Sequence, residues 1–332
     1  MTRRALAPLF LTAVLISACG SDEDPAAGTG GSGGGAGSGG GAASGGSGGS
    51  AGSGGAAGSA GSAGSGGAVA GTYAVKVIPD AAGLHVGKSQ LRLAVTTQAD
   101  GQPATGLAAA LGLGPVMQMG QMTHGAPVPI DAVKESPTPG TYDATLFFSM
   151  ASGASGGWTL KVSANETLID TLPIKVDEAQ GTDTTHASLK NVADTIKTPM
   201  GSDKPRNWFL FRDTLTAVSG GHELQLFLAT VQDGNMVWPP VTVGLKLVDG
   251  AGKEKLTVTS LAVQVSTDGT TWAPMTCGAT ARCKATVHGL PQGAKSDLLV
   301  KMAVNGTDYT TDGSAVDSAK KNGFATFSVT AP

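Results

Sequence analysis

The residues best suited to chemistry lie in one short segment, MQMGQMTHG, which spans residues 117–125. Its side chains with metal-binding atoms are Met117, Met119, Met122 and His124. Thioethers are soft ligands that suit Cu(I), and an imidazole adds a nitrogen donor. Two methionines spaced by one residue share a face of a strand, and Gly120 permits a turn that folds the next two ligands back beside them. The segment therefore predicts a Cu(I) site with three sulfur donors and one nitrogen donor.

The same segment is also typical of core packing. Methionine is flexible and fills irregular gaps between sheets, and the proline- and glycine-rich stretch from 112 to 129 predicts such gaps. The sequence alone leaves metal binding and packing open. It does predict that Met150, which alternates with Leu146 and Phe148, belongs to the core rather than to the ligand set.

Sequence patterns of enzymes are missing from the chain. There is no Gly-x-Ser-x-Gly elbow and no phosphate-binding glycine loop followed by Lys-Ser or Lys-Thr, and HELQL (222–226) lacks the second histidine of a zinc protease motif. No catalytic residue is predicted. We expect a protein that acts by binding and is not an enzyme.

The first residues indicate where the protein resides. Arg3 and Arg4 precede an apolar run of signal-peptide length, Ala5–Ile16, and the segment closes as LISAC at Cys19. This resembles the lipobox of bacterial lipoproteins. The resemblance implies a signal peptide over 1–18, acylation of Cys19 by a fatty acid such as palmitate, and a lipoprotein held in a membrane of the cell envelope, on its periplasmic face or outer surface.

The two other cysteines, Cys277 and Cys283, form an even pair in the segment TCGATARC. A disulfide between them suits an oxidising envelope compartment. A metal site is the other possibility, but the spacing exceeds that of zinc knuckles and His288 is the only nearby nitrogen ligand. The pair favours the disulfide.

Composition defines a tether and excludes one class of partner. Residues 19–71 are rich in Gly, Ser and Ala and have little apolar surface to bury, which predicts a disordered tether with a reach of about 40 Å. The net charge is −3, without a basic run, so the sequence argues against nucleic acid as a partner. The predicted contact with a membrane is through the N-terminal lipid.

After the tether, apolar residues alternate with a period of two between Gly, Pro and Asp turns. Leu91, Leu93 and Val95 show it, and so do Trp158, Leu160 and Val162. This pattern predicts an all-β fold with two tandem immunoglobulin-like antiparallel β-sandwiches, over 72–178 and 182–332. One segment, SLKNVADTIK (188–197), instead has helical spacing and predicts a short helix.

The first predicted sandwich is similar to the YtkA-like and FixH-like family of envelope domains over residues 72–175. The residues that carry the similarity are Met119, Met122, His124 and Gly125 in the turn, Gly140 and Tyr142 at a strand entry, Met150 at a strand end, and Gly157 with Trp158 in the last element. The resemblance implies an immunoglobulin-like fold and, for some members, a role in copper transport or in assembly of haem–copper oxidases.

Two functions follow as hypotheses. In the first, the protein is a lipid-anchored envelope binding protein that handles Cu(I) or assists respiratory assembly, with an envelope protein or copper as partner. In the second, it is a structural or protein-binding surface module without metal. For that second function, a groove could be lined by the aromatic residues Trp208, Phe209, Phe211, Phe227 and Trp238. The same five residues are also consistent with a core.

Overall fold

The computed structural model describes residues 72–153, 156–198, 201–234 and 237–332, all of which belong to one compact unit. Within these ranges the chain forms strands and turns and no helix, so none is long and apolar enough to span a membrane. The predicted all-β class is confirmed. The predicted signal peptide, Cys19 and tether lie outside the described residues.

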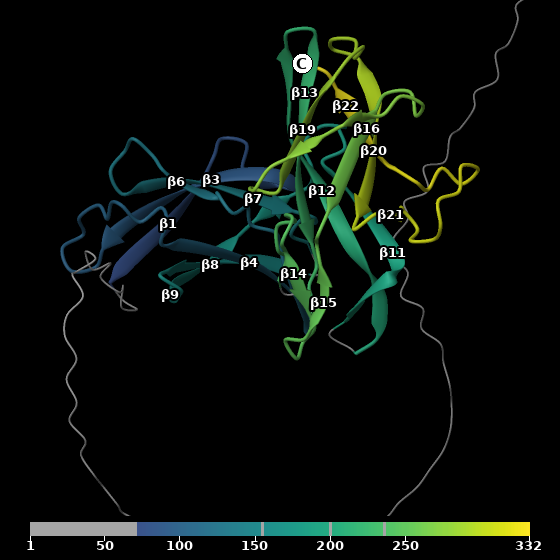
Figure 1. Ribbon diagram of the computed structural model, residues 1–332. Helices are drawn as coiled ribbons and strands as arrows, with labels where there is room; N and C mark the ends of the chain where they lie inside the picture. The colour runs from purple at the N-terminus through teal and green to yellow at the C-terminus, as the bar shows by residue number, and fades with distance from the viewer. Residues whose placement is uncertain (1–71, 154–155, 199–200, 235–236) are drawn as a thin grey trace, which may run out of the picture. The chain divides into compact units, whose positions relative to one another are not determined.

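Two sheets are built from residues 73–174, and we call them the N-terminal pair (Figure 1). In spatial order, one sheet contains β1 (Tyr73–Pro79), β3 (Gly87–Thr97), β7 (Thr141–Phe148) and β6 (Val133–Glu135). The other contains β5 (Met122–Gly125), β4 (Leu111–Met119), β8 (Gly157–Ala164) and β9 (Thr167–Ile174). All neighbours in both sheets are antiparallel.

Alternating side chains explain why these strands form and pack. In β3, Leu91, Leu93 and Val95 are buried while the intervening residues face outward, and β8 repeats this with Trp158 and Leu160. Because both sheets turn their apolar faces to one shared cluster, burial of that cluster stabilises the two layers together. The sandwich-like layering expected for this part of the chain is present.

Residues 186–330 supply two further main sheets, the C-terminal pair. One contains, in order, β11 (His186–Lys197), β12 (Asp203–Val218), β13 (Gly221–Thr230), β19 (Arg282–Val287) and β18 (Thr276–Cys277). The other contains β17 (Ala273–Pro274), β16 (Leu261–Ser266), β20 (Lys295–Val304) and β21 (Thr307–Tyr309), with β22 (Ala325–Thr330) also paired to β20. These sheets share their own apolar cluster.

Two small pairings complete the described fold. They are the parallel pair of β2 (Leu84–His85) with β10 (Val176–Asp177) and the antiparallel pair of β14 (Lys246–Val248) with β15 (Glu254–Thr257). The division into domains at 72–178 and 182–332 stays a prediction.

The predicted helix over residues 188–197 is wrong. This segment lies in β11, which pairs antiparallel with β12 through a register shift between Lys190 and Thr195. The backbone partners in β12 satisfy its hydrogen bonds, and Leu189 and Ile196 are buried against different clusters. Val192 falls within the irregular stretch and is exposed, so the apparent helical spacing arose from a bulge.

A third apolar cluster joins residues of the two pairs. Phe147 of β7 stacks on Phe227 of β13 with ring centroids 4.5 Å apart, and its centroid lies 5.3 Å from that of Phe211 in β12. Ion pairs lie in the same region. Lys88 contacts Asp213 at 2.6 Å, and Arg282 pairs with both Asp213 and Asp131.

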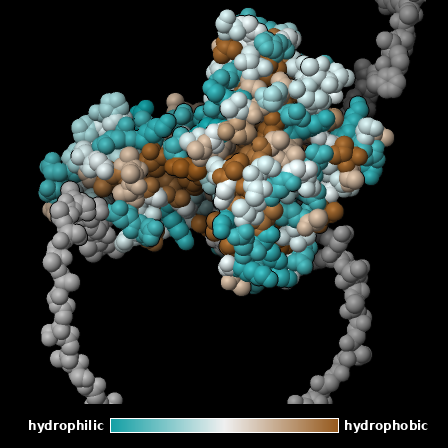
Figure 2. All heavy atoms as spheres, in the orientation of Figure 1, coloured by the Kyte–Doolittle hydropathy of each residue, from teal (hydrophilic) through white to brown (hydrophobic). Residues whose placement is uncertain are grey.

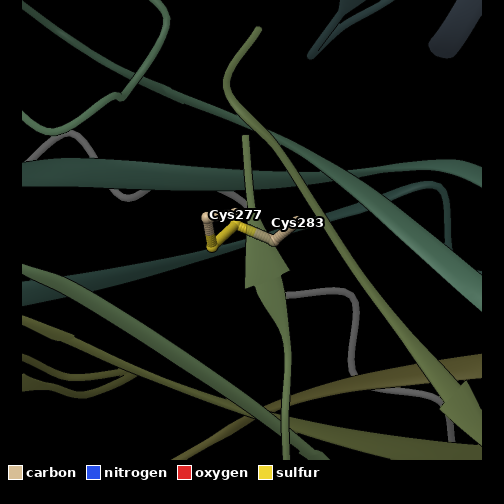
Figure 3. Close-up of a disulfide and its surroundings, with 2 residues drawn as sticks. All are labelled: Cys277 and Cys283. Carbon is tan, nitrogen blue, oxygen red and sulfur yellow. A yellow bond between two sulfur atoms is a disulfide. The ribbon is translucent and has the colours of Figure 1, made fainter. Parts of the chain in front are cut away.

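The predicted disulfide is present. Cys277 in β18 lies directly opposite Cys283 in β19, with 3.9 Å between the two Cα atoms, and the sulfurs are bonded (Figure 3). Cys283 is buried in the core of the C-terminal pair, so the bridge ties the short edge strand to that core.

Some apolar residues reach the surface. Figure 2 shows brown, hydrophobic areas between hydrophilic ones on the visible face. Exposed large apolar side chains of the described residues include Met122, Met150, Val237, Val243 and Val316. Two of these are methionines of the region discussed next.

Candidate functional site: a methionine–histidine cluster

A tight hairpin brings the four predicted ligands together. Strands β4 and β5 are joined at Gly120, whose φ of 56° lies in the left-handed region that glycine adopts easily. Met117 lies opposite His124, and Met119 lies opposite Met122. Opposite residues of an antiparallel pair share a face, as do residues two apart along a strand, so all four side chains lie on one face of the hairpin.

These side chains differ in how deeply they lie. Met117 is 1% exposed and belongs to the core of the N-terminal pair, Met119 is half-buried, and Met122 is 42% exposed. Gly156 allows two of them to approach: a Cβ atom there would lie 2.8 Å from Met119 Cγ and 3.1 Å from Met117 Cε. The sulfur atoms of the hairpin thus extend from the core to the surface.

The side chain of His124 is held in place by burial and by a hydrogen bond. Its side chain is 4% exposed, and its Nδ1 lies 2.9 Å from the carbonyl oxygen of Gly125. Because a carbonyl oxygen only accepts, Nδ1 carries the proton and donates, and this hydrogen-bond geometry assigns the tautomer. Burial lowers the pKa of His124, although the hydrogen bond to Gly125 raises it in part. The imidazole is therefore neutral near pH 7, and Nε2 presents a lone pair.

That lone pair faces the sulfur of Met150. His124 Nε2 and Met150 Sδ are 2.9 Å apart. With the proton on Nδ1, both atoms are electron-pair donors and no hydrogen lies between them. Two electron-pair donors that point at each other without a proton between them could both bind one soft cation.

Met150 is a candidate ligand that sequence reasoning missed. It was expected in the core with Phe148, but β7 ends at Phe148 and the alternation ends with it. Met150 is 39% exposed, and its carbonyl oxygen accepts a hydrogen bond of 3.1 Å from Trp158 Nε1. The available signal was its place at the strand end in the YtkA-like pattern.

Aromatic rings enclose the imidazole. Trp158 lies edge-on to His124 with centroids 5.1 Å apart, and Trp238, which follows β13 in the chain, lies 6.3 Å away at 41°. Tryptophan faces attract cations when water is excluded. Harder ligands do not gather elsewhere: among the described residues there is no group of three or more His, Cys, Asp or Glu side chains that could hold a metal.

The aromatic residues considered for a groove are instead part of the core. Trp208, Phe211, Phe227 and Trp238 are buried, and Phe209 is half-buried. Phe209 packs on Trp238 with centroids 4.7 Å apart. They fill the interior and do not form an open surface for a partner.

Comparisons with known proteins leave the family open. No family model matches the chain, and no curated protein matches it. Among solved structures, domains 5–6 of the S-layer protein SbsC are 12% identical over 78% of this chain and 97% of that one, with a TM-score of 0.22. A structure of domains 4–9 of SbsC is 11% identical over 78% of this chain and 32% of that one, also with a TM-score of 0.22.

Proposed function

We propose that this protein is a lipid-anchored envelope protein that binds Cu(I) at the methionine–histidine cluster. The observation that carries the proposal is the close approach of His124 Nε2 and Met150 Sδ, a nitrogen donor and a thioether 2.9 Å apart, with the imidazole proton assigned to Nδ1 by its hydrogen bond to Gly125. Met119 and Met122, on the same face of the hairpin as His124, supply the further thioethers. Met117, buried beneath them, serves mainly as packing.

Ligand chemistry favours copper in its reduced state. Thioether sulfur selects Cu(I) over harder cations, and a neutral imidazole completes a low-coordinate set. Met122 and Met150 are exposed, so an ion can enter and leave without unfolding of the sheet. This arrangement suits a protein that binds the metal and transfers it to another protein.

The fold and location belong to the same proposal. We infer that the N-terminal pair is an immunoglobulin-like domain of the YtkA-like or FixH-like type, supported by its two antiparallel layers and by the positions of Gly140, Met150 and Trp158 at turn and strand ends. The lipobox at Cys19 and the tether support anchoring in the envelope. Intact-mass spectrometry of membrane-extracted protein would show the acyl chains on Cys19, and an unmodified residue there would remove the anchor from the proposal.

Competition with a chromogenic Cu(I) chelator tests metal binding. A Cys19→Ser background keeps that thiol from binding copper. We expect this parent to withdraw one Cu(I) from the chelator, and Met150→Leu and Met122→Leu each to weaken binding about tenfold or more, since each removes one donor. Met122 and Met150 are 42% and 39% exposed and leucine has a similar volume, so both replacements preserve the fold.

Methionines of the C-terminal pair provide the matched control. Met275 and Met302 are buried in its core, and their replacement by leucine leaves the cluster intact. We expect both variants to compete like the parent. If the Met119→Leu/Met122→Leu/Met150→Leu variant also competes like the parent, copper binding at this cluster is refuted and the structural or protein-binding function takes its place.

A further inference from the structure

A second candidate site lies in the C-terminal pair. A cavity of about 530 Å³ opens on the outward side of β20 and β22. The turn after β16 borders it, and so does the long loop between β21 and β22, drawn in yellow in Figure 1. Its lining includes Trp272, Phe324, Leu299, Asp297, Lys301 and Lys321. None of these belongs to the methionine–histidine cluster.

An aromatic wall dominates the apolar part of this cavity. Trp272 and Phe324 have centroids 6.1 Å apart, and Trp272 Nε1 donates a hydrogen bond of 3.2 Å to the carbonyl of Gly269, which orients the indole. Lys301 Nζ lies 3.8 Å from the Trp272 centroid. An ammonium group therefore occupies this ring face, and the C–H groups of a ligand, which also have positive character, would take its place when Lys301 turns away.

The polar groups that line the cavity include both positive and negative charges. Asp268 is committed to its own turn, because Thr270 N and Thr271 N donate to its carboxylate at 2.7 and 2.8 Å and hold its pKa far below the usual range. Within the described residues, the side chains of Asp297 and Lys321 make no hydrogen bond or ion pair. Free acceptors and free donors thus surround one aromatic wall.

This combination identifies a class of ligand. A cavity of this size exceeds what a single ammonium group would fill and lies within the range of small-molecule sites. Three carboxylates and two ammonium groups line the cavity, but Asp268 and Asp317 accept hydrogen bonds from backbone N–H groups and Lys301 lies over Trp272. Among the described residues, the groups left without a partner are one carboxylate, Asp297, and one ammonium, Lys321, so their charges balance and do not favour a cation. A pyranose presents C–H groups to an aromatic face and hydroxyls that both donate and accept at its edge.

We propose that this cavity binds a neutral saccharide, with a pyranose ring stacked on Trp272 and hydroxyls bonded to Asp297 and Lys301. The ammonium of Lys301 turns away from the ring and donates to the sugar. The C-terminal pair would then hold the protein to a polysaccharide of the envelope. This inference is independent of the copper proposal and stands if that proposal fails.

Saturation-transfer NMR and calorimetry with the full chain test it, using maltotriose, cellotriose and tri-N-acetylchitotriose as probes. We expect at least one of them to bind. Trp272→Ala should weaken that binding about tenfold or more through the lost stacking, and Asp297→Ala should weaken it by a smaller factor. Because Asp297 is exposed and its side chain has no partner, the second variant keeps the test valid if the first does not fold. Val243→Ala, exposed and outside the cavity, should bind like the parent.

Three results would overturn the inference. One is the absence of binding by all three saccharides at millimolar concentration. Another is a saccharide that binds both variants as tightly as the parent, which would place it elsewhere. The third is binding of tetramethylammonium alone, tightened in Lys301→Met, which would make the cavity a cation site with Lys301 as its internal competitor.

Discussion

Replacement of Phe147 by alanine should cost about 4 kcal/mol of stability. Phe147 points away from Leu146 and Phe148 on β7, yet it is fully buried because Phe227 and Phe211 cover it. Burial of an aromatic side chain removes roughly 150–250 Å² from water, worth roughly 4–6 kcal/mol at about 25 cal/mol per Å². Measured losses for Phe→Ala in cores are roughly 3–5 kcal/mol, and the expected value lies where the two ranges overlap.

Urea unfolding followed by circular dichroism measures this loss. Phe147→Leu is the graded control, because it retains most of the apolar volume and should lose only about 1–2 kcal/mol. Phe148→Ala, one residue along and in the core of the N-terminal pair, should lose an amount similar to Phe147→Ala. A loss below about 1 kcal/mol for Phe147→Ala would mean that the residue faces solvent, as strand alternation alone predicts, and would refute the shared cluster.

Three further predictions concern the disulfide, the ion pairs and pH. Reduction of Cys277–Cys283 should lower the free energy of unfolding by about 2 kcal/mol, the value for so short a loop, and equal stability of the oxidised and reduced chains would contradict a structural role. Arg282→Met should lower the free energy of unfolding by about 3 kcal/mol, because it leaves the buried Asp213 with Lys88 alone and leaves Asp131 without its ion-pair partner Arg282. Denaturation at neutral pH measures this loss, and a value near zero would show that the ion pairs do not form. Burial lowers the pKa of His124 below its ordinary 6.5, so as the pH drops the unfolded chain binds the proton before the folded chain does, and stability falls below pH 6.5. A His124→Gln variant should lose less stability over the same pH range. Identical slopes of stability against pH for the variant and the parent would place His124 in solvent.

Local pattern was sufficient to predict most strands and the hairpin of the candidate site. The alternation in β3 and β8 is set by adjacent residues, and Gly120 marks the turn that pairs Met117 with His124. The disulfide also followed from close spacing. Each of these features depends on residues that are near one another in the chain.

The features that could not be predicted depend on distant partners. β11 is a strand because β12 pairs with it, and its bulge imitates helical spacing. Phe147 is buried by residues of β12 and β13, about seventy positions away. Met150 becomes a ligand candidate only because β7 ends before it and His124 lies opposite. The cavity at Trp272 likewise needs the loop before β22 to form one of its walls.

X-ray absorption at the copper edge tests the central claim most directly. Cu(I) is added in equimolar amount to the Cys19→Ser chain, which is then desalted. The account predicts a copper centre surrounded by sulfur scatterers and one imidazole nitrogen, with one sulfur fewer in Met150→Leu. A protein that retains no copper, or a spectrum that Met150→Leu leaves unchanged, would contradict it.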